Sequence, residues 1–268
     1  MKEVFPLMST TDSTSCNFKK YSFKSFDGYE LDFKVYGSNA QKNFVKRRPV
    51  IIFLFGGGWS TGSFDHFQNQ AMAFAEHGYI AVTPAYRIFS VHGTTIETAL
   101  RDVFCFLQIL GKMDVQLGID RCNVFLSGGS AGGHLALSAL LINNCMHELL
   151  IKGLVLFNPI LDTSSSGFQN EAIIQQPFDP IIYSPLHHIK PNLPPTIIFQ
   201  GTEDEIAKYA TAEKFVATMA RAGNFCELVA YKGRPHGFFN PRSSNLIEDY
   251  HDTLEKSVAF CDKTLSYT

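Results

Sequence analysis

The sequence has little net charge and no extended stripe of basic residues. Its 23 Lys and Arg residues stand against 25 Asp and Glu, which gives a formal net charge of -2. Proteins that bind nucleic acid or anionic membranes depend on clustered positive charge. We therefore expect neither nucleic acid nor a membrane among the partners of this chain.

The sequence also lacks the spacings that hold metals. No two of the six cysteines form a C-x-x-C pair, and the adjacent His187 and His188 have no third ligand at a suitable spacing. We interpret the two histidines as loop or core residues. Thiols within apolar runs behave as small apolar side chains. The pattern predicts a reducing compartment and no structural zinc; the cysteines are Cys16, Cys105, Cys122, Cys145, Cys226 and Cys261.

Long apolar runs are absent as well. No stretch approaches the roughly 18 apolar residues needed to span a bilayer. The first twenty residues lack the apolar core of a secretion signal. A cytoplasmic location is the expectation, unless a leader has been removed.

What the sequence does have is the length and apolar content of one sizeable domain. It has 268 residues, of which 45% are hydrophobic, enough to bury a large core. Residues 1–20 are polar and rich in Ser and Thr, which predicts a flexible tail. Residues 21–268 then form a single domain. Within it, residues 21–26 and 31–36 alternate apolar and polar around Asp27-Gly28, which predicts an antiparallel hairpin.

From Val50 onward, apolar β-rich runs alternate with helical patterns, which is typical of a three-layer α/β sandwich with a mainly parallel sheet. Residues 163–194 break the alternation with Ser-rich and Pro-rich sequence and predict a short cap insertion. The expected strands are residues 50–55, 79–83, 123–127, 153–157, 196–200 and 227–231. The expected helices are residues 67–76, 96–116, 131–142, 209–222 and 246–265.

One short motif in this alternation carries chemistry. The strand at 123–127 runs into Gly128-Gly129-Ser130-Ala131-Gly132-Gly133, followed by a helix. A G-x-S-x-G sequence between a strand and a helix predicts a nucleophile elbow, in which Ser130 lies on a sharp turn. The first N–H groups of the helix, including that of Ala131, then point toward an oxyanion formed on Ser130.

Three more segments follow strands in the same way. Gly56-Gly57-Gly58-Trp59 comes after residues 50–55, and its N–H groups can approach a reacting carbonyl. Asp204 follows residues 196–200, and His236 follows residues 227–231. The chain order Ser130, Asp204, His236 fits a triad of nucleophile, orienting acid and base. Glu203 and Glu205 flank Asp204, and either remains an alternative for the acid.

These motifs together resemble those of the α/β-hydrolase superfamily, within it the hormone-sensitive-lipase-like and acetyl- and feruloyl-esterase-like small carboxylesterases. The match runs from about residue 21 to the final helix. Two positions depart from the family pattern. Phe55 replaces the histidine before the glycines, so the hydrogen bond of that histidine must be replaced or absent, and we expect Phe55 to be buried. Gly129 stands where lipase-like members carry Asp, which favours the acetyl- and feruloyl-esterase-like branch.

The resemblance implies a serine carboxylesterase that hydrolyses short-chain or small aryl esters through an acyl-enzyme, with no cofactor or metal. Gly57, Gly58 and Ala131 would supply the oxyanion hole. An arylformamidase-type amidase of the same fold is the alternative, and a non-catalytic small-molecule-binding protein is a further one. The expected partner is a small ester, and a homodimer stays open. Aromatic candidates for the pocket are Trp59, Phe64, Phe168, Phe178 and Phe238.

Overall fold

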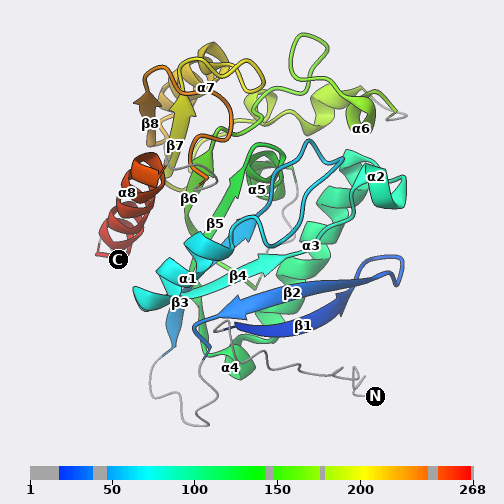
Figure 1. Ribbon diagram of the computed structural model, residues 1–268, viewed down its shortest axis with the longest axis vertical. Helices are drawn as coiled ribbons and strands as arrows, with labels where there is room; N and C mark the ends of the chain where they lie inside the picture. Colours follow the sequence, from blue (N-terminus) through cyan, green and yellow to red (C-terminus); the bar gives the residue numbers. More distant parts are fainter. Residues whose placement is uncertain (1–17, 39–46, 143–147, 176–178, 241–246, 267–268) are drawn as a thin grey trace.

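A single sheet of eight strands organises the computed structural model, which describes residues 18–38, 47–142, 148–175, 179–240 and 247–266 (Figure 1). The strand order is β1-β2-β4-β3-β5-β6-β7-β8. β1 pairs antiparallel with β2 and β2 antiparallel with β4, whereas all later pairs are parallel. The strands are β1 (Phe18–Lys24), β2 (Glu30–Tyr36), β3 (Arg48–Leu54), β4 (Ile80–Pro84), β5 (Ile119–Gly129), β6 (Ile151–Phe157), β7 (Thr196–Gly201) and β8 (Cys226–Tyr231).

The predicted hairpin is confirmed, but it begins earlier than expected. β1 starts at Phe18, so residues 18–20 of the predicted tail are strand, while residues 1–17 lie outside the described part of the chain. Lys19 and Lys20 pair with Val35 and Lys34 of β2. An ion pair of 2.6 Å between Lys20 and Asp32 compensates for the polar character of the first residues. A diagonal ion pair can therefore support a polar stretch of strand even where two lysines stand directly opposite each other.

Alternate side chains of β3 lie on opposite faces of the sheet. Val50, Ile52 and Leu54 pack into one buried cluster, and the residues between them pack into the other. The first cluster includes residues of α3 (Ile96–Lys112), α5 (Ala131–Leu141) and α7 (Tyr209–Arg221). The second includes residues of α1 (Gln68–Glu76) and α8 (Ile247–Ser266). The predicted three-layer sandwich is thereby confirmed.

One predicted helix is wrong in its extent. The helical pattern at residues 96–116 is divided into α3 and a short α4 (Asp114–Leu117), with Met113 closing the first. The N–H of Met113 bonds to both Ile109 O and Leu110 O, which tightens the last turn of α3. Gly118, at φ 70°, then ends α4 in the left-handed conformation. Apolar periodicity continues across this break, so the sequence alone does not reveal it.

Residues 163–194, the predicted cap insertion, lie between β6 and β7. Their described part contains only short helical turns, namely α6 (Glu171–Ile174), η1 (Pro180–Tyr183) and η2 (Pro185–His187). In Figure 1, α6 and α2 (Phe89–His92) are both drawn at the upper right, toward the end of the molecule to which β5 and β7 point. The carboxyl ends of the parallel strands lie toward this side, where loops gather in α/β folds. The cap is thus placed over the loops that carry the predicted site.

Candidate active site

Ser130 occupies the turn between β5 and α5 in a backbone conformation that side chains rarely adopt. Its φ is 54° and its ψ is -119°. The turn is tight because α5 approaches β3 closely: a Cβ added at Gly132 would lie 2.0 Å from Leu54 O. Only glycine fits at that position. The strained serine and its small neighbour are the features expected of a nucleophile elbow.

The three residues predicted to act together lie within hydrogen-bond distance of one another. Ser130 Oγ is 3.0 Å from His236 Nε2, and His236 Nδ1 is 2.8 Å from Asp204 Oδ2. They come from the loops after β5, β7 and β8. In this arrangement the imidazole can take a proton from the serine while the carboxylate holds its tautomer.

Hydrogen bonds to both carboxylate oxygens hold the Asp204 side chain in place. Its side chain is fully buried, and Oδ1 accepts hydrogen bonds from the N–H groups of Ile206 and Ala207 at 2.9 and 2.8 Å. Oδ2 accepts from Gln200 Nε2 at 2.9 Å in addition to facing His236. These donors fix the carboxylate so that it orients the imidazole. Both neighbouring glutamates are exposed to solvent instead.

Asn158 is a member of the site that sequence reasoning missed. It follows β6 at φ 35°, and its side-chain Nδ2 lies 3.4 Å from His236 Nε2. Its Oδ1 accepts the N–H of Gly237 at 3.1 Å, so it holds the loop that carries the histidine. Asn tolerates positive φ better than most residues. An Asn directly after a buried strand, before Pro159, was the available signal.

The glycine loop folds into a turn beside Ser130. The N–H groups of Ser60 and Thr61 both bond to Gly57 O at 3.0 Å. Gly57 has φ 126°, and a Cβ there would lie 2.1 Å from Thr61 O. A Cβ at Gly56 would lie 3.2 Å from Ser130 Cβ, which places the loop against the nucleophile.

The three N–H groups predicted to form an oxyanion hole are available. Among the described residues, no hydrogen bond is donated by the backbone N–H of Gly57, Gly58 or Ala131. An unpaired N–H near a buried serine is suited to binding a developing negative charge. The turn that the glycines form is therefore compatible with the predicted role of these three N–H groups as oxyanion donors.

Phe55 is buried, with 2% of its surface exposed, which confirms the expectation for this position. Its ring stacks on Tyr86, with 3.9 Å between ring centroids and 5° between planes, within the same buried cluster as the side chains of β3 and β4. The Tyr86 hydroxyl donates a hydrogen bond of 2.6 Å to Phe55 O. Burial raises the pKa of Tyr86, so the hydroxyl stays protonated and remains a donor. Tyr86 thus supplies the support that the sequence left unexplained.

Packing also explains why Gly129 stands at the position where lipase-like members of the family carry Asp. A Cβ at this position would lie 2.8 Å from Phe239 Cζ and 3.2 Å from Phe67 Cζ. The two rings fill the space that an aspartate side chain would need. The departure from the lipase-like pattern therefore follows from aromatic packing under the elbow.

The aromatic pocket candidates have different surroundings. Trp59 is fully buried and lies 6.0 Å from Phe168, which is half-buried and borders Gly58. Phe64 is also half-buried, and Lys34 lies over its ring. Phe238 is fully buried against Tyr231 at 4.5 Å, within the cluster on the α1 and α8 face, so it is a core residue. Phe178 lies outside the described residues.

His134 joins the cap to the rest of the domain, whereas His188 makes its contact within the cap. His134 packs on Trp59, with 4.9 Å between ring centroids, and its Nε2 lies 2.7 Å from Tyr183 O. Burial lowers the pKa of His134 to about 3, so the ring is neutral at pH 7. His188 Nε2 lies 3.2 Å from Ile181 O within the cap.

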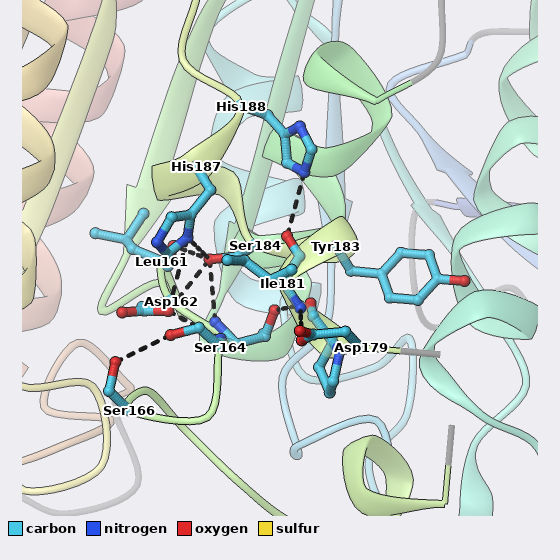
Figure 2. A network of polar contacts seen from close by, with 12 residues as sticks. Leu161, Asp162, Ser164, Ser166, Asp179, Ile181, Tyr183, Ser184, His187 and His188 are labelled. Carbon is cyan, nitrogen blue, oxygen red and sulfur yellow. Dashed lines mark hydrogen bonds and ion pairs between the residues drawn. The ribbon is translucent and has the colours of Figure 1, made fainter. Parts of the chain in front are cut away.

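Figure 2 shows the polar network at the base of the cap. His187 Nδ1 is 2.8 Å from Ser184 Oγ, which donates to Asp162 Oδ1 at 3.3 Å. Burial alone would raise the pKa of Asp162, but hydrogen bonds from Ser164, the nearby His187 and the Ser184 hydroxyl together bring it below its ordinary value. Ser184 is fully buried, so this second Ser-His-Asp grouping ties the chain together and exposes no nucleophile.

The described ranges of the chain contain neither a metal-binding cluster nor a membrane-spanning helix. No group of three or more His, Cys, Asp or Glu side chains in these ranges is arranged to hold a metal ion. Within the same ranges, every helix is too short or too polar to cross a bilayer.

Residues 51–240 match the family described as having the alpha/beta hydrolase fold. The matched stretch is more than half of the chain, so the protein belongs to the α/β-hydrolase family. The predicted fold and family are thereby confirmed.

The solved structures that this chain resembles include those of an esterase. The apo form of Thermogutta terrifontis esterase 2 is 33% identical, with a TM-score of 0.83, and the match covers 92% of this chain and 94% of that one. The same enzyme has been solved with butyrate bound (32% identity, TM-score 0.81, covering 92% and 94%) and phosphorylated by paraoxon (33%, 0.80, covering 91% and 93%).

A curated relative is a probable isoprenylcysteine alpha-carbonyl methylesterase of Arabidopsis thaliana. It is 24% identical over 230 residues, which cover 73% of this chain and 46% of that protein. The chain spans about half the length of the first curated relatives it matches. Together the comparisons place this domain among hydrolases that act on esters.

Proposed function

We propose that the protein is a serine carboxylesterase that hydrolyses short-chain or small aryl esters through an acyl-enzyme. The observation that carries the proposal is the relay of 3.0 and 2.8 Å from Ser130 through His236 to Asp204. Its position beside three unpaired N–H groups adds an anion-binding site to a nucleophile and base.

In the proposed reaction, Ser130 Oγ attacks the ester carbonyl carbon while His236 Nε2 takes the hydroxyl proton. The carbonyl oxygen becomes an oxyanion that accepts hydrogen bonds from Gly57, Gly58 and Ala131. His236 then gives its proton to the leaving alcohol oxygen as the bond to the carbonyl carbon breaks. Loss of one oxyanion donor typically costs about 3 to 4 kcal/mol of transition-state stabilisation.

The second half of the reaction repeats these roles with water. His236 takes a proton from water, whose oxygen attacks the acyl carbon, and a second oxyanion forms in the same hole. His236 protonates Ser130 Oγ as the carboxylic acid leaves. Asp204 stabilises the imidazolium in both halves, and its buried, fully bonded carboxylate suits that role.

Small substrates are favoured by the immediate surroundings of the serine. The ring of Phe168 borders Gly58 and lies 6.0 Å from that of the fully buried Trp59. The related esterase has been solved with the four-carbon acid butyrate. The relatives compared are esterases, and no feature of the site favours the formamidase alternative.

The test is a series of p-nitrophenyl esters from acetate to octanoate, compared with N-formylkynurenine. We expect turnover to be greatest for the two- to four-carbon acyl chains and Ser130→Ala to abolish it while retaining the parent's unfolding temperature. Faster hydrolysis of N-formylkynurenine would move the activity to the amidase alternative. Undiminished turnover by Ser130→Ala would remove Ser130 from the mechanism.

A further inference from the structure

One side chain of the cap makes direct contact with the glycine loop. Asn170 Nδ2 donates a hydrogen bond of 2.6 Å to Gly58 O, across 112 positions of sequence. A Cβ at Gly58 would lie only 2.8 Å from the same nitrogen, which shows how closely the cap approaches. Gly58 is one of the proposed oxyanion donors, so the contact is made at the reacting end of the site.

The geometry of Gly58 makes this contact consequential. Glycine has wide conformational freedom. The Gly58 N–H lies in the planar Gly57–Gly58 peptide and points opposite to Gly57 O, so it stays in place only while Gly58 itself is kept from changing conformation. The Gly57–Gly58 peptide is held inside the turn, because Gly57 O accepts the N–H groups of Ser60 and Thr61. Among the described residues, Asn170 supplies the one hydrogen bond to the Gly58–Trp59 peptide.

Other bonds to the loop arrive from a different side. Tyr86 bonds to Phe55 O, and the N–H groups of Phe89 and Ser90 bond to Trp59 O and Ser60 O. These contacts hold the ends of the loop to the segment after β4. In the described part of the chain, Asn170 makes the one hydrogen bond from the cap to the loop.

Asn170 is itself firmly placed. Its Oδ1 accepts the N–H of Ile173 at 3.1 Å and so caps α6. Ala172 and Ile173 of that helix are fully buried, which anchors the turn in the core. The side-chain amide of Asn170 therefore bonds to the cap through Oδ1 and to the glycine loop through Nδ2, so it links the two rigidly.

We propose that Asn170 is a positioning residue. By holding Gly58 O from the cap, it restrains the Gly58–Trp59 peptide, and so it keeps Gly58 and the adjoining N–H in place for the oxyanion. The inference rests on the proposed ester hydrolysis. It predicts an effect that appears mainly in the transition state, because the ground-state carbonyl depends less on the hole than the oxyanion does.

The experiment compares Asn170→Ser with Asp179→Ser. Asp179 caps η1 in the same cap, through Ile181 N at 3.0 Å, and bonds to no residue of the glycine loop in the described structure. Serine keeps an N-cap oxygen at both positions, but it lacks the amide that reaches Gly58. On p-nitrophenyl butyrate, we expect Asn170→Ser to lower kcat by about tenfold to a hundredfold with KM little changed. Asp179→Ser should retain the parent's kcat.

Hydrogen exchange measured by mass spectrometry gives a readout independent of turnover. The peptide that contains residues 55–61 should exchange faster in Asn170→Ser than in the parent and in Asp179→Ser. Unchanged exchange overturns the proposal, as does a fall in kcat below about threefold or an equal fall in Asp179→Ser. If the parent itself hydrolyses no ester, the proposed function fails, and the exchange arm still decides whether Asn170 holds the loop.

Discussion

At the scale of single residues, Asp204 differs from the two glutamates beside it in burial and in bonding. Its carboxylate is fully buried and faces His236 at 2.8 Å, whereas Glu203 and Glu205 are exposed. The conversion Asp204→Asn should lower kcat by about 10⁴-fold, because the amide favours the wrong imidazole tautomer. Steady-state kinetics on p-nitrophenyl acetate measures this, with circular dichroism to check the fold.

The glutamates serve as matched controls for that prediction. Glu203→Gln and Glu205→Gln remove a carboxylate from the same loop without touching the relay, so each should keep nearly all of the parent's kcat. A reversed ranking, with one of the glutamine variants inactive and Asp204→Asn active, would move the acid to that glutamate.

Phe55 provides a second prediction at this scale. Its ring is buried against Tyr86, so Phe55→His places an imidazole where an apolar ring stacked. An unpartnered buried polar group costs about 1 to 3 kcal/mol, and we expect loss of both unfolding free energy and activity. Phe55→Ala should cost about 3 to 5 kcal/mol through the cavity it leaves. Urea denaturation measures both changes.

Tyr86→Phe separates stacking from hydrogen bonding. It keeps the ring but removes the donor to Phe55 O, so it should destabilise by about 1 to 3 kcal/mol and disturb the glycine loop.

The Phe55→His variant also tests the packing account itself. If it folds as well as the parent and hydrolyses esters faster, the loop has other polar partners and the packing account is wrong.

At the scale of elements, the alternation of strands and helices and the order of the motif loops were predictable because both are encoded locally. Glycines at a close approach, apolar periodicity and turn residues are properties of neighbouring positions. The contacts of Tyr86 and Asn170 were not predictable, because each acts across the fold: Asn170, for example, reaches Gly58 over 112 positions. Asn158 had a local signal in its place after a strand, but its contact with His236 also spans the fold. Phe238 illustrates the same limit, since an aromatic residue two positions after His236 can face either the pocket or the core.

His134 links α5 to the cap and gives a prediction about pH. Burial lowers its pKa to about 3 in the folded protein, below the ordinary value of 6.5. Between these values the unfolded chain binds a proton that the folded chain does not, so stability falls as the pH drops below 6.5. At pH 5 this group alone should cost about 2 kcal/mol.

The variant His134→Gln isolates that contribution. Glutamine can still donate to Tyr183 O but does not titrate, so its unfolding free energy should fall less than the parent's between pH 7 and pH 5. Urea denaturation at the two pH values measures the difference. Equal losses in the parent and in the variant would show that His134 does not carry the effect.

At the scale of the whole molecule, the eight-stranded sheet and the loops at its carboxyl edge bring together residues from four separate motifs. The match to the Thermogutta esterase covers 92% of the chain, which agrees with one α/β-hydrolase unit. The curated relatives extend well beyond it, since the chain spans about half of their length. The cytoplasmic location and the homodimer stay predictions.

The central claim is that Ser130 is the nucleophile of this unit. Paraoxon phosphorylates the related esterase, and an activated serine should displace its nitrophenolate. After treatment of the full chain with paraoxon, mass spectrometry of the digested protein should find one diethylphosphoryl group, on Ser130, and none in Ser130→Ala or His236→Ala. An unmodified parent chain, or a group attached to another serine such as Ser184, would contradict the account.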